Sequence, residues 1–276
     1  SLGYLGGLLS LGVCLAWVNH AQAAGQSASQ FVPATMLITA SLFALASTPT
    51  FLLLRERARP LTGDGNPWRD AYSRVMDTVR QAARFRDMKR LLICIVFYQA
   101  GIQTVVALAA IYAQQALGFS TADTIGLILV VNVTAAVGAF AFGHVQDRFG
   151  HIATLAATLI GWILMTLLAW QSEDRTSFWV AANIAGICLG SSQSAGRALV
   201  AYLSPSNRHA EFFGLWGQAV KLSSILGPVT YGIVTWVSGG DHRLAMLVTG
   251  GFFVIGLFLL FGIDVARGRQ AAAVES

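Results

Sequence analysis

Charged residues are scarce in this 276-residue sequence: 11% of its residues are Asp, Glu, Lys or Arg, whereas 55% are apolar. A soluble globular protein carries about 25% charged residues. The apolar residues also gather in long blocks, which is typical of segments that cross a membrane. These proportions exclude an ordinary soluble domain and predict an integral membrane protein.

The sequence also lacks paired cysteines at disulfide or metal-binding spacing, and it lacks known catalytic motifs. The three cysteines stand singly inside apolar blocks, so they predict neither a disulfide framework nor a metal site. The sequence contains no H-E-x-x-H, G-x-S-x-G or Walker pattern, and its five histidines are scattered in loops or at block edges. We therefore expect no enzyme, no cofactor and no metal.

Carboxylates are absent from the middle of every apolar block. The acidic residues nearest to the blocks all lie near their ends: Asp123, Asp147, Glu211 and Asp264. This excludes an intramembrane aspartyl protease and argues against a proton relay through this part of the chain. Asp123 closes the stretch Ser120-Thr121-Ala122-Asp123, which is typical of a helix start, so we expect a capping residue there and not a proton carrier.

What the sequence does contain is eight apolar blocks, each long enough to cross a hydrocarbon core of about 30 Å. Their ranges are 2–18, 31–54, 91–116, 122–143, 152–170, 178–203, 212–237 and 244–263. Because lipid cannot pair backbone N–H and C=O groups, each block should be a helix. In the seventh block, Gly227-Pro228 predicts a kink or a discontinuity.

The cations set the orientation. If the 55–90 connection is cytoplasmic, alternation places fourteen Arg and Lys residues on that side and only Arg175 and Arg243 on the other. Such a bias marks the cytoplasmic face, and it explains the net charge of +5 better than nucleic-acid binding does. Within this connection, Asn66-Pro67 followed by spaced apolar residues predicts a basic amphipathic helix on the inner membrane surface.

The beginning of the chain is a further expectation. The sequence starts at Ser1 without a methionine, and its first apolar block follows at once, so we interpret it as a fragment. The alternative is a signal peptide over residues 1–24, cleaved after Ala21-Gln22-Ala23. That alternative lacks a basic first region, since no Arg or Lys precedes Arg55.

Polar residues are concentrated in the third, fourth, sixth and seventh blocks, while the fifth and eighth carry few. Polar groups inside a bilayer usually face a cavity or the bundle interior, so we expect these four spans to line a cavity and the other two to face lipid. Lys221 and Gln193 each lie about 15 Å from the cytoplasmic end of their span, near the midplane. The candidate substrate-binding residues are Lys221, Gln193, Gln103, Tyr98, Gln218 and Asn132.

Two further features of the sequence are a short charged turn and small residues spaced four apart. Gly143–Gly150 forms a charged turn that reads G-x-x-x-D-R-x-G on the cytoplasmic side. The candidate gating residues are Asp147, Arg148, Gly143, Gly150 and Arg197. Small residues four apart predict close helix packing at three places: Gly3/Gly7, Ala135/Ala139/Gly143 and Gly186/Gly190.

The turn resembles the loop motif of the major facilitator superfamily, which occurs between spans two and three and again between spans eight and nine. A closer likeness is to the vacuolar-effluxer-like facilitators, carried by stretches in the same order along the chain. These are 4–7, 98–104, 190–197, 205–214, and Lys221 with Gly227-Pro228. This chain differs from that family at Gln99 and Ala100, where the family commonly has Asn and an acidic residue. It also differs around Arg197.

The resemblance implies an all-α integral membrane fold whose eight transmembrane helices correspond to spans 5–12 of a twelve-helix facilitator. It divides the chain into 1–54 (the end of the first six-helix half), 55–90 (the cytoplasmic loop), 91–264 (the second half) and 265–276 (the cytoplasmic tail). Four upstream spans of the same chain would complete it. Asp147 is then expected to latch onto the span start at residues 1–4.

The implied function is secondary transport of a small solute, such as an amino acid, by alternating access. The implied partners are an anionic or zwitterionic solute and membrane lipids, with no nucleic acid. The implied location is a bacterial inner membrane, multi-pass, with the 55–90 loop and the C-terminus cytoplasmic. Two alternatives stay open: a lipid or lysophospholipid translocator of the same fold, and a non-transporting membrane scaffold.

Overall fold

The computed structural model describes residues 2–54 and 85–274, and every regular element among them is an α-helix. All eight apolar blocks are helical, which confirms the all-α prediction. The amphipathic helix expected after Asn66-Pro67 lies outside the described residues. Six described helices are long and apolar enough to cross a membrane: α2, α4, α5, α6, α8 and α9. The helix over 175–203 is as long, but its serines, Asn183 and Gln193 dilute its apolar character.

The chain divides into two compact units, residues 1–67 and 68–276. In the first, α1 (Leu2–Ala23) and α2 (Ala28–Leu53) pack against each other as a hairpin. The turn between them contains Gly25, whose φ of 75° suits glycine. Gln30 accepts a hydrogen bond from the backbone N–H of Ser27, which fixes the start of α2.

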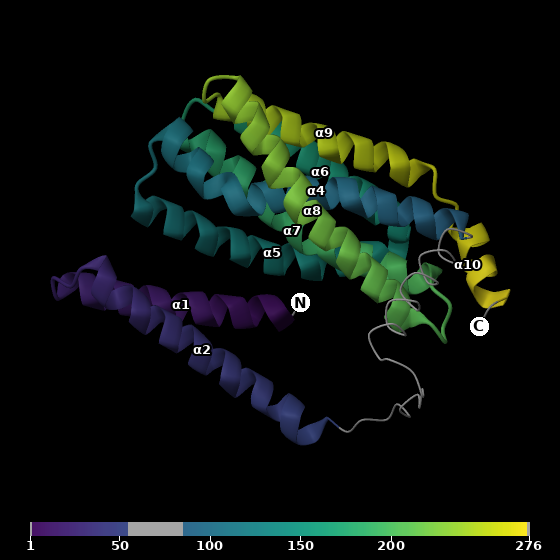
Figure 1. The fold of residues 1–276 in the computed structure, drawn as a ribbon, viewed down its shortest axis with the longest axis horizontal. Helices are drawn as coiled ribbons and strands as arrows, with labels where there is room; N and C mark the ends of the chain where they lie inside the picture. Colours follow the sequence, from purple (N-terminus) through teal and green to yellow (C-terminus); the bar gives the residue numbers. More distant parts are fainter. Residues whose placement is uncertain (1, 55–84, 275–276) are drawn as a thin grey trace, which may run out of the picture. The chain divides into compact units, whose positions relative to one another are not determined.

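The second unit contains six long helices and one short helix among its described residues (Figure 1). They are α4 (Arg86–Leu117), α5 (Thr121–Phe149), α6 (His151–Gln171), α7 (Arg175–Leu203), α8 (His209–Val237), α9 (His242–Phe261) and α10 (Val265–Val274). α4 begins five residues before its apolar block, so its first turn is charged. Because carboxylate and guanidinium groups are costly in hydrocarbon, we expect that turn to lie outside the hydrocarbon layer.

Polar caps define the helix ends. Ser120 and Asp123 form a reciprocal capping box, with the Asp123 N–H 3.1 Å from Ser120 Oγ and the Ser120 N–H 3.0 Å from Asp123 Oδ2. This confirms Asp123 as a cap. Its carboxylate also lies 3.3 Å from Arg175, so it joins the starts of α5 and α7.

The core of this unit is built around α4 and α7. α4 packs against α8 and α9, while α7 packs against α5 and α6. α6 and α9 join the two sets, and Trp162 stacks on Phe253 there with ring centroids 5.1 Å apart. The buried Tyr112 hydroxyl donates to the Ala169 carbonyl at 2.6 Å, so its polar group is satisfied within the apolar interior.

Small residues allow α5 and α7 to approach closely. A Cβ on Gly190 would lie 1.9 Å from the Ala135 carbonyl oxygen, and one on Gly186 would lie 2.7 Å from the Val131 carbonyl oxygen. These contacts confirm two of the predicted packing sites. The space beside Gly7 and Gly143 is open, so these two glycines make no comparable contact among the described residues.

α8 is continuous from His209 to Val237, so of the predicted kink or discontinuity at Gly227-Pro228 the discontinuity is wrong, while the kink stays a prediction. Gly227 instead permits close packing, because a Cβ there would lie 2.1 Å from the Ala100 carbonyl oxygen. Glycine at 227 therefore lets α8 approach α4 beside the proline.

The long helices differ in how much of their surface the unit covers. In the most apolar stretch of α5 only 22% of residues are buried, and in α8 only 17%, against 44% in α9, 50% in α6 and 56% in α4. α5 and α8 therefore present the most open faces. α6 satisfies its own threonines, since Thr154, Thr158 and Thr166 each donate to a carbonyl of the same helix or of its cap.

Candidate functional site

A polar contact joins the two central helices at mid-depth. The side-chain amide of Gln193 on α7 donates to the amide oxygen of Gln99 on α4, at 3.4 Å. Gln99 is 1% exposed, while Gln193 is half-buried. Gln193 lies ten residues before the end of α7, or about 15 Å along the helix, which places this bridge near the middle of the span.

Two further candidate residues stand on the open face of α8. Gln218 and Lys221, one helical turn apart, are both exposed in this unit. Lys221 lies twelve residues after the start of α8, about 18 Å along the helix, so its depth is similar to that of Gln193. No hydrogen bond or ion pair of its side chain occurs among the described residues, which leaves a cation at mid-depth available to a solute.

Gln103 adds a third position. It follows Gln99 by four residues on α4, so the two amides share one face of that helix, and Gln103 is half-buried. Three helices thus contribute polar side chains at comparable depth. The structure joins Gln193 to Gln99 directly, and it shows no direct contact of Lys221 with either among the described residues.

Asn132 occupies a different environment. Its amide nitrogen donates to the Ile128 carbonyl of its own helix at 2.8 Å, and its side chain borders an apolar cavity of about 210 Å³ between α4, α5, α6 and α7. The cavity is lined mainly by aliphatic residues, with Trp162 and Phe178. Asn132 therefore lies apart from the amide bridge.

Tyr98 is closed inside the core with no exposed surface. Its hydroxyl has no hydrogen-bond partner among the described residues and lies 2.4 Å from where a Cβ on Gly196 would stand. Glycine at 196 therefore makes room for the tyrosine. In this conformation Tyr98 contacts neighbouring helices and not an open cavity, so a substrate contact there stays a prediction.

The charged turn between α5 and α6 is organised by Gly150. This residue has φ 83° and ψ 171°, a conformation open essentially to glycine alone, and it both ends α5 and precedes α6. Across the turn, the Gln146 amide nitrogen lies 2.7 Å from His151 Nδ1. The final glycine of the motif is thus required by the backbone, whereas Gly143 is helical.

The other gating candidates lie at the same end of the unit. Arg197 is exposed, and its guanidinium lies over the Trp216 ring at 5.1 Å, which links α7 to α8. Arg148 lies over the ring of its neighbour Phe149 at 5.7 Å. Asp147 is exposed and borders a pocket with Gln146 and His151. Its expected latch to residues 1–4 stays a prediction.

Sequence reasoning missed Gln99 as a site residue and treated it only as a departure from a family pattern. The signal that could have found it is its spacing, because Gln99 and Gln103 are one turn apart on a helix that buries mainly apolar residues. Its partner on α7 could not be inferred from spacing within α4.

Known proteins resemble the chain along most of its length. The model of the family described as "Vacuole effluxer Atg22 like" matches residues 1–273. An uncharacterized MFS-type transporter of Bacillus subtilis, YxiO, is 24% identical over 264 residues, covering 94% of this chain and 60% of that protein. Autophagy-related protein 22-1 of Aspergillus fumigatus is 28% identical, covering 98% of this chain and 48% of that protein.

Two solved structures share the fold. The Escherichia coli fucose:proton symporter aligns with a TM-score of 0.62 at 15% identity, covering 89% of this chain and 60% of that one. A bacterial homolog of the human lysosomal transporter Spinster, in an inward-facing conformation, aligns at 0.58 with 14% identity, covering 99% and 68%. At these identities the likeness shows the fold alone.

The membrane-length helices and the likeness to these solved structures define a multi-pass membrane protein with the fold of the major facilitator transporters. Within that class, the chain belongs to the Atg22-like vacuole effluxer family. It spans about 60% or less of the curated relatives described above.

Proposed function

We propose that the protein is a secondary transporter that moves a small solute across the membrane by alternating access. The observation that carries this proposal is the mid-depth polar set on three helices: the Gln193–Gln99 bridge, Gln103, and Lys221, whose cation has no ion pair among the described residues. Polar groups at this depth are costly in a bilayer unless they serve a cavity or a partner. The family and fold described above support the same function.

The charge of Lys221 indicates the class of solute. An ammonium group without a carboxylate partner favours a solute that carries its own carboxylate or phosphate. Adjacent amides can donate to that group and also accept from an ammonium on the same solute. An anionic or zwitterionic molecule, with an amino acid as the first candidate, fits this combination.

Membrane and orientation follow from the cation bias. We propose that the protein resides in a bacterial inner membrane with residues 55–90 and the C-terminus on the cytoplasmic side. The ends of α7 and α9 and the start of α8 then lie on that side, together with the turn at Gly150. Arg148, Arg197 and Asp147 are there proposed to act at the cytoplasmic gate.

Counterflow of labelled amino acids tests the proposal, with the complete protein reconstituted in liposomes. Lys221→Ala should reduce the rate by about tenfold, because a hydrogen bond to a charged group is worth about 1.5–3 kcal/mol. The matched control is Lys89→Ala, which removes the other lysine of this chain, exposed in the charged first turn of α4. It should transport at the wild-type rate.

The outcomes separate the parts of the proposal. Equal, non-zero counterflow in wild type and Lys221→Ala removes Lys221 from the site. Absence of counterflow with every amino acid rejects that solute class, and absence of transport of any solute by the reconstituted protein rejects the function.

A further inference from the structure

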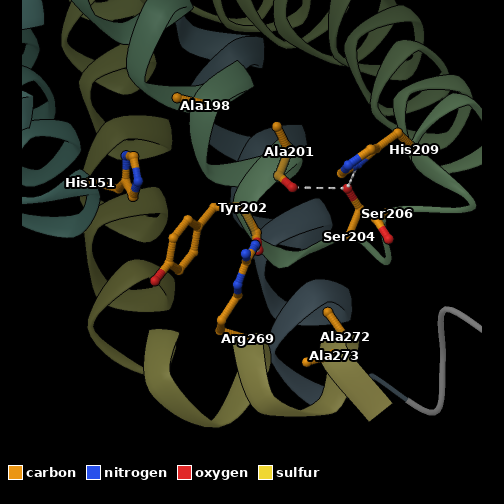
Figure 2. A pocket seen from close by; sticks show the side chains of 10 residues that line it. All are labelled: His151, Ala198, Ala201, Tyr202, Ser204, Ser206, His209, Arg269, Ala272 and Ala273. Atoms are coloured by element: carbon orange, nitrogen blue, oxygen red, sulfur yellow. Dashed lines mark hydrogen bonds between the residues drawn. The ribbon is translucent and has the colours of Figure 1, made fainter. Parts of the chain in front are cut away.

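A second, distinct pocket opens at the cytoplasmic end of the unit. It has a volume of about 590 Å³ and lies where α7 ends, α6 and α8 begin, and α10 crosses (Figure 2). The polar lining includes His151, Tyr202, Ser204, His209 and Arg269. A volume of this size accommodates a small organic ligand. None of the candidate transport residues at mid-depth lines it.

The charged lining of this pocket is cationic, while Asp147 borders the adjoining pocket, which shares His151 and Tyr202. None of its ten lining residues is Asp or Glu, and Arg269 supplies a permanent cation. The Arg269 guanidinium lies over the Tyr202 ring at 4.7 Å, and its Nη1 donates to the Tyr202 carbonyl at 3.1 Å. A guanidinium has five N–H donors, so this fixed cation retains donors for a ligand.

Hydrogen bonds at the pocket wall also orient the two imidazoles. The Gln146 amide can only donate through Nε2, so His151 Nδ1 accepts at 2.7 Å and the neutral ring carries its proton on Nε2. The Ser204 hydroxyl donates its single proton to the Ala201 carbonyl at 3.1 Å, so it accepts from His209 Nδ1 at 2.6 Å. Both rings are therefore held through Nδ1. Nε2–H of His151 is left to donate to a ligand, whereas Nε2 of the neutral His209 ring carries no proton and can only accept.

Two of the four last carbonyls of α7 are directed away from a ligand by hydrogen bonds of their own. They belong to Ala201 and Tyr202 and accept hydrogen bonds from Ser204 and Arg269. The first residues of α6 and α8 are His151 and His209, so two helix N-termini, with their positive dipole ends, border the same space.

The location of the pocket selects the ligand. Its walls are formed by the ends of membrane-length helices and by α10, which follows α9, so it lies at the level of the lipid headgroups on the expected cytoplasmic side. We propose that this pocket binds the phosphate group of an anionic ligand, either the headgroup of an anionic phospholipid or a soluble phosphate, through Arg269 and His151. Bidentate donation from the guanidinium suits that group.

Binding of phosphatidylglycerol tests the proposal, with the complete protein in detergent and native mass spectrometry as the readout. In the lipid arm, wild type is titrated with phosphatidylglycerol and with phosphatidylcholine; in the soluble arm, inorganic phosphate at matched ionic strength replaces the lipid. Arg269→Gln should weaken the phosphatidylglycerol complex by about tenfold, since a charge-assisted bond is lost. The control is Arg243→Gln, which removes an equal charge at the other end of the unit.

A second pair of variants tests the same pocket without removing Arg269, in case Arg269→Gln does not fold. Ala273 lines the pocket and is exposed on α10, so Ala273→Glu adds a carboxylate to the lining without loss of a packed side chain. It should weaken binding, whereas Ala273→Gln should bind like wild type.

The arms give separate answers. Binding of phosphatidylglycerol alone identifies a lipid headgroup site, and binding of inorganic phosphate as well identifies a site for the phosphate group itself. Equal binding by wild type, Arg269→Gln and Ala273→Glu, equal loss in Arg243→Gln, or absence of binding in both arms overturns the proposal.

Discussion

The guanidinium of Arg267 on α10 donates two hydrogen bonds to the carboxylate of Asp87 at the start of α4, at 2.8 and 2.6 Å. Asp87 is 3% exposed, and it also accepts from the Asp264 backbone N–H at 2.9 Å. These bonds to Asp87 raise the pKa of Arg267. The pair fixes α10 to α4, and Gly268 beside it lets α10 approach Leu203 at the end of α7.

The Asp87–Arg267 pair should stabilise the second unit. Arg267→Gln leaves a buried carboxylate without its cation, which is more costly than removal of both charges. We expect the melting temperature of the purified protein to fall by about 5 °C. The double variant Asp87→Asn/Arg267→Gln should recover most of this loss, because two amides can still bond. An equal fall in Arg243→Gln would show that the effect is unspecific.

Close packing of α5 on α7 makes a prediction at Gly190. A methyl group there would meet the Ala135 carbonyl, so Gly190→Ala must push the helices apart, at a cost of about 1–3 kcal/mol. Gly126→Ala is the matched control, because Gly126 lies in α5 with open space beside its Cβ position. That change should be neutral or stabilising, since alanine favours helices. Thermal unfolding in detergent measures both variants, and equal melting temperatures would contradict the close approach.

The two glycines of the charged turn between α5 and α6 should behave differently. Gly150→Ala places a side-chain-bearing residue at φ 83° and ψ 171°, which costs about 1–3 kcal/mol. Gly143 is helical with open space around it, so Gly143→Ala should be tolerated. Expression level and melting temperature compare the two variants. If Gly143→Ala is the more damaging, then the turn geometry is not the reason for the motif.

Asp174 should make the stability of the unit depend on pH. It lies at the start of α7, at the end of the unit opposite to Gly150. The Ser177 hydroxyl, followed by the Ser177 N–H, donates to this N-cap carboxylate and lowers its pKa. Because the folded-state pKa lies below the unfolded value of about 4, the cap stabilises the fold above that value. The stabilisation is lost as the pH falls through the folded-state pKa. Asp174→Asn should keep the cap and lose this acid dependence in thermal unfolding between about pH 5 and 2.

Much of the fold was predictable because few backbone conformations are stable inside a lipid bilayer. A backbone inside a bilayer must pair its own polar groups, so long apolar blocks specify helices regardless of their neighbours. Local caps were equally visible, since Ser120 and Asp123 are three residues apart. Gly186 and Gly190 were correctly placed at a close approach, while Gly143, with the same spacing from Ala139, was not. Spacing fixes which side of a helix is small, but not which neighbour faces it.

The candidate site was less accessible from sequence. Lys221 and Gln193 were identified from their depth alone, which counting residues gives directly. Gln99 was missed because its role depends on a residue 94 positions later, on another helix. The burial of Tyr98 by the packing of α4 against α7 and α9 could not be inferred from spacing either, and its contact with substrate stays a prediction.

The sequence by itself determined the helices, the expected side of the cytoplasmic turn and the depth of each polar residue, because these depend on hydropathy and on distance along one helix. Only the tertiary structure decided which polar groups meet. Gln99 meets Gln193, and Asp87 meets Arg267, across helices far apart in the chain, and Arg269, His151 and His209 line one pocket from three different helices. Their partners are set by how the helices pack, and no local pattern encodes that arrangement.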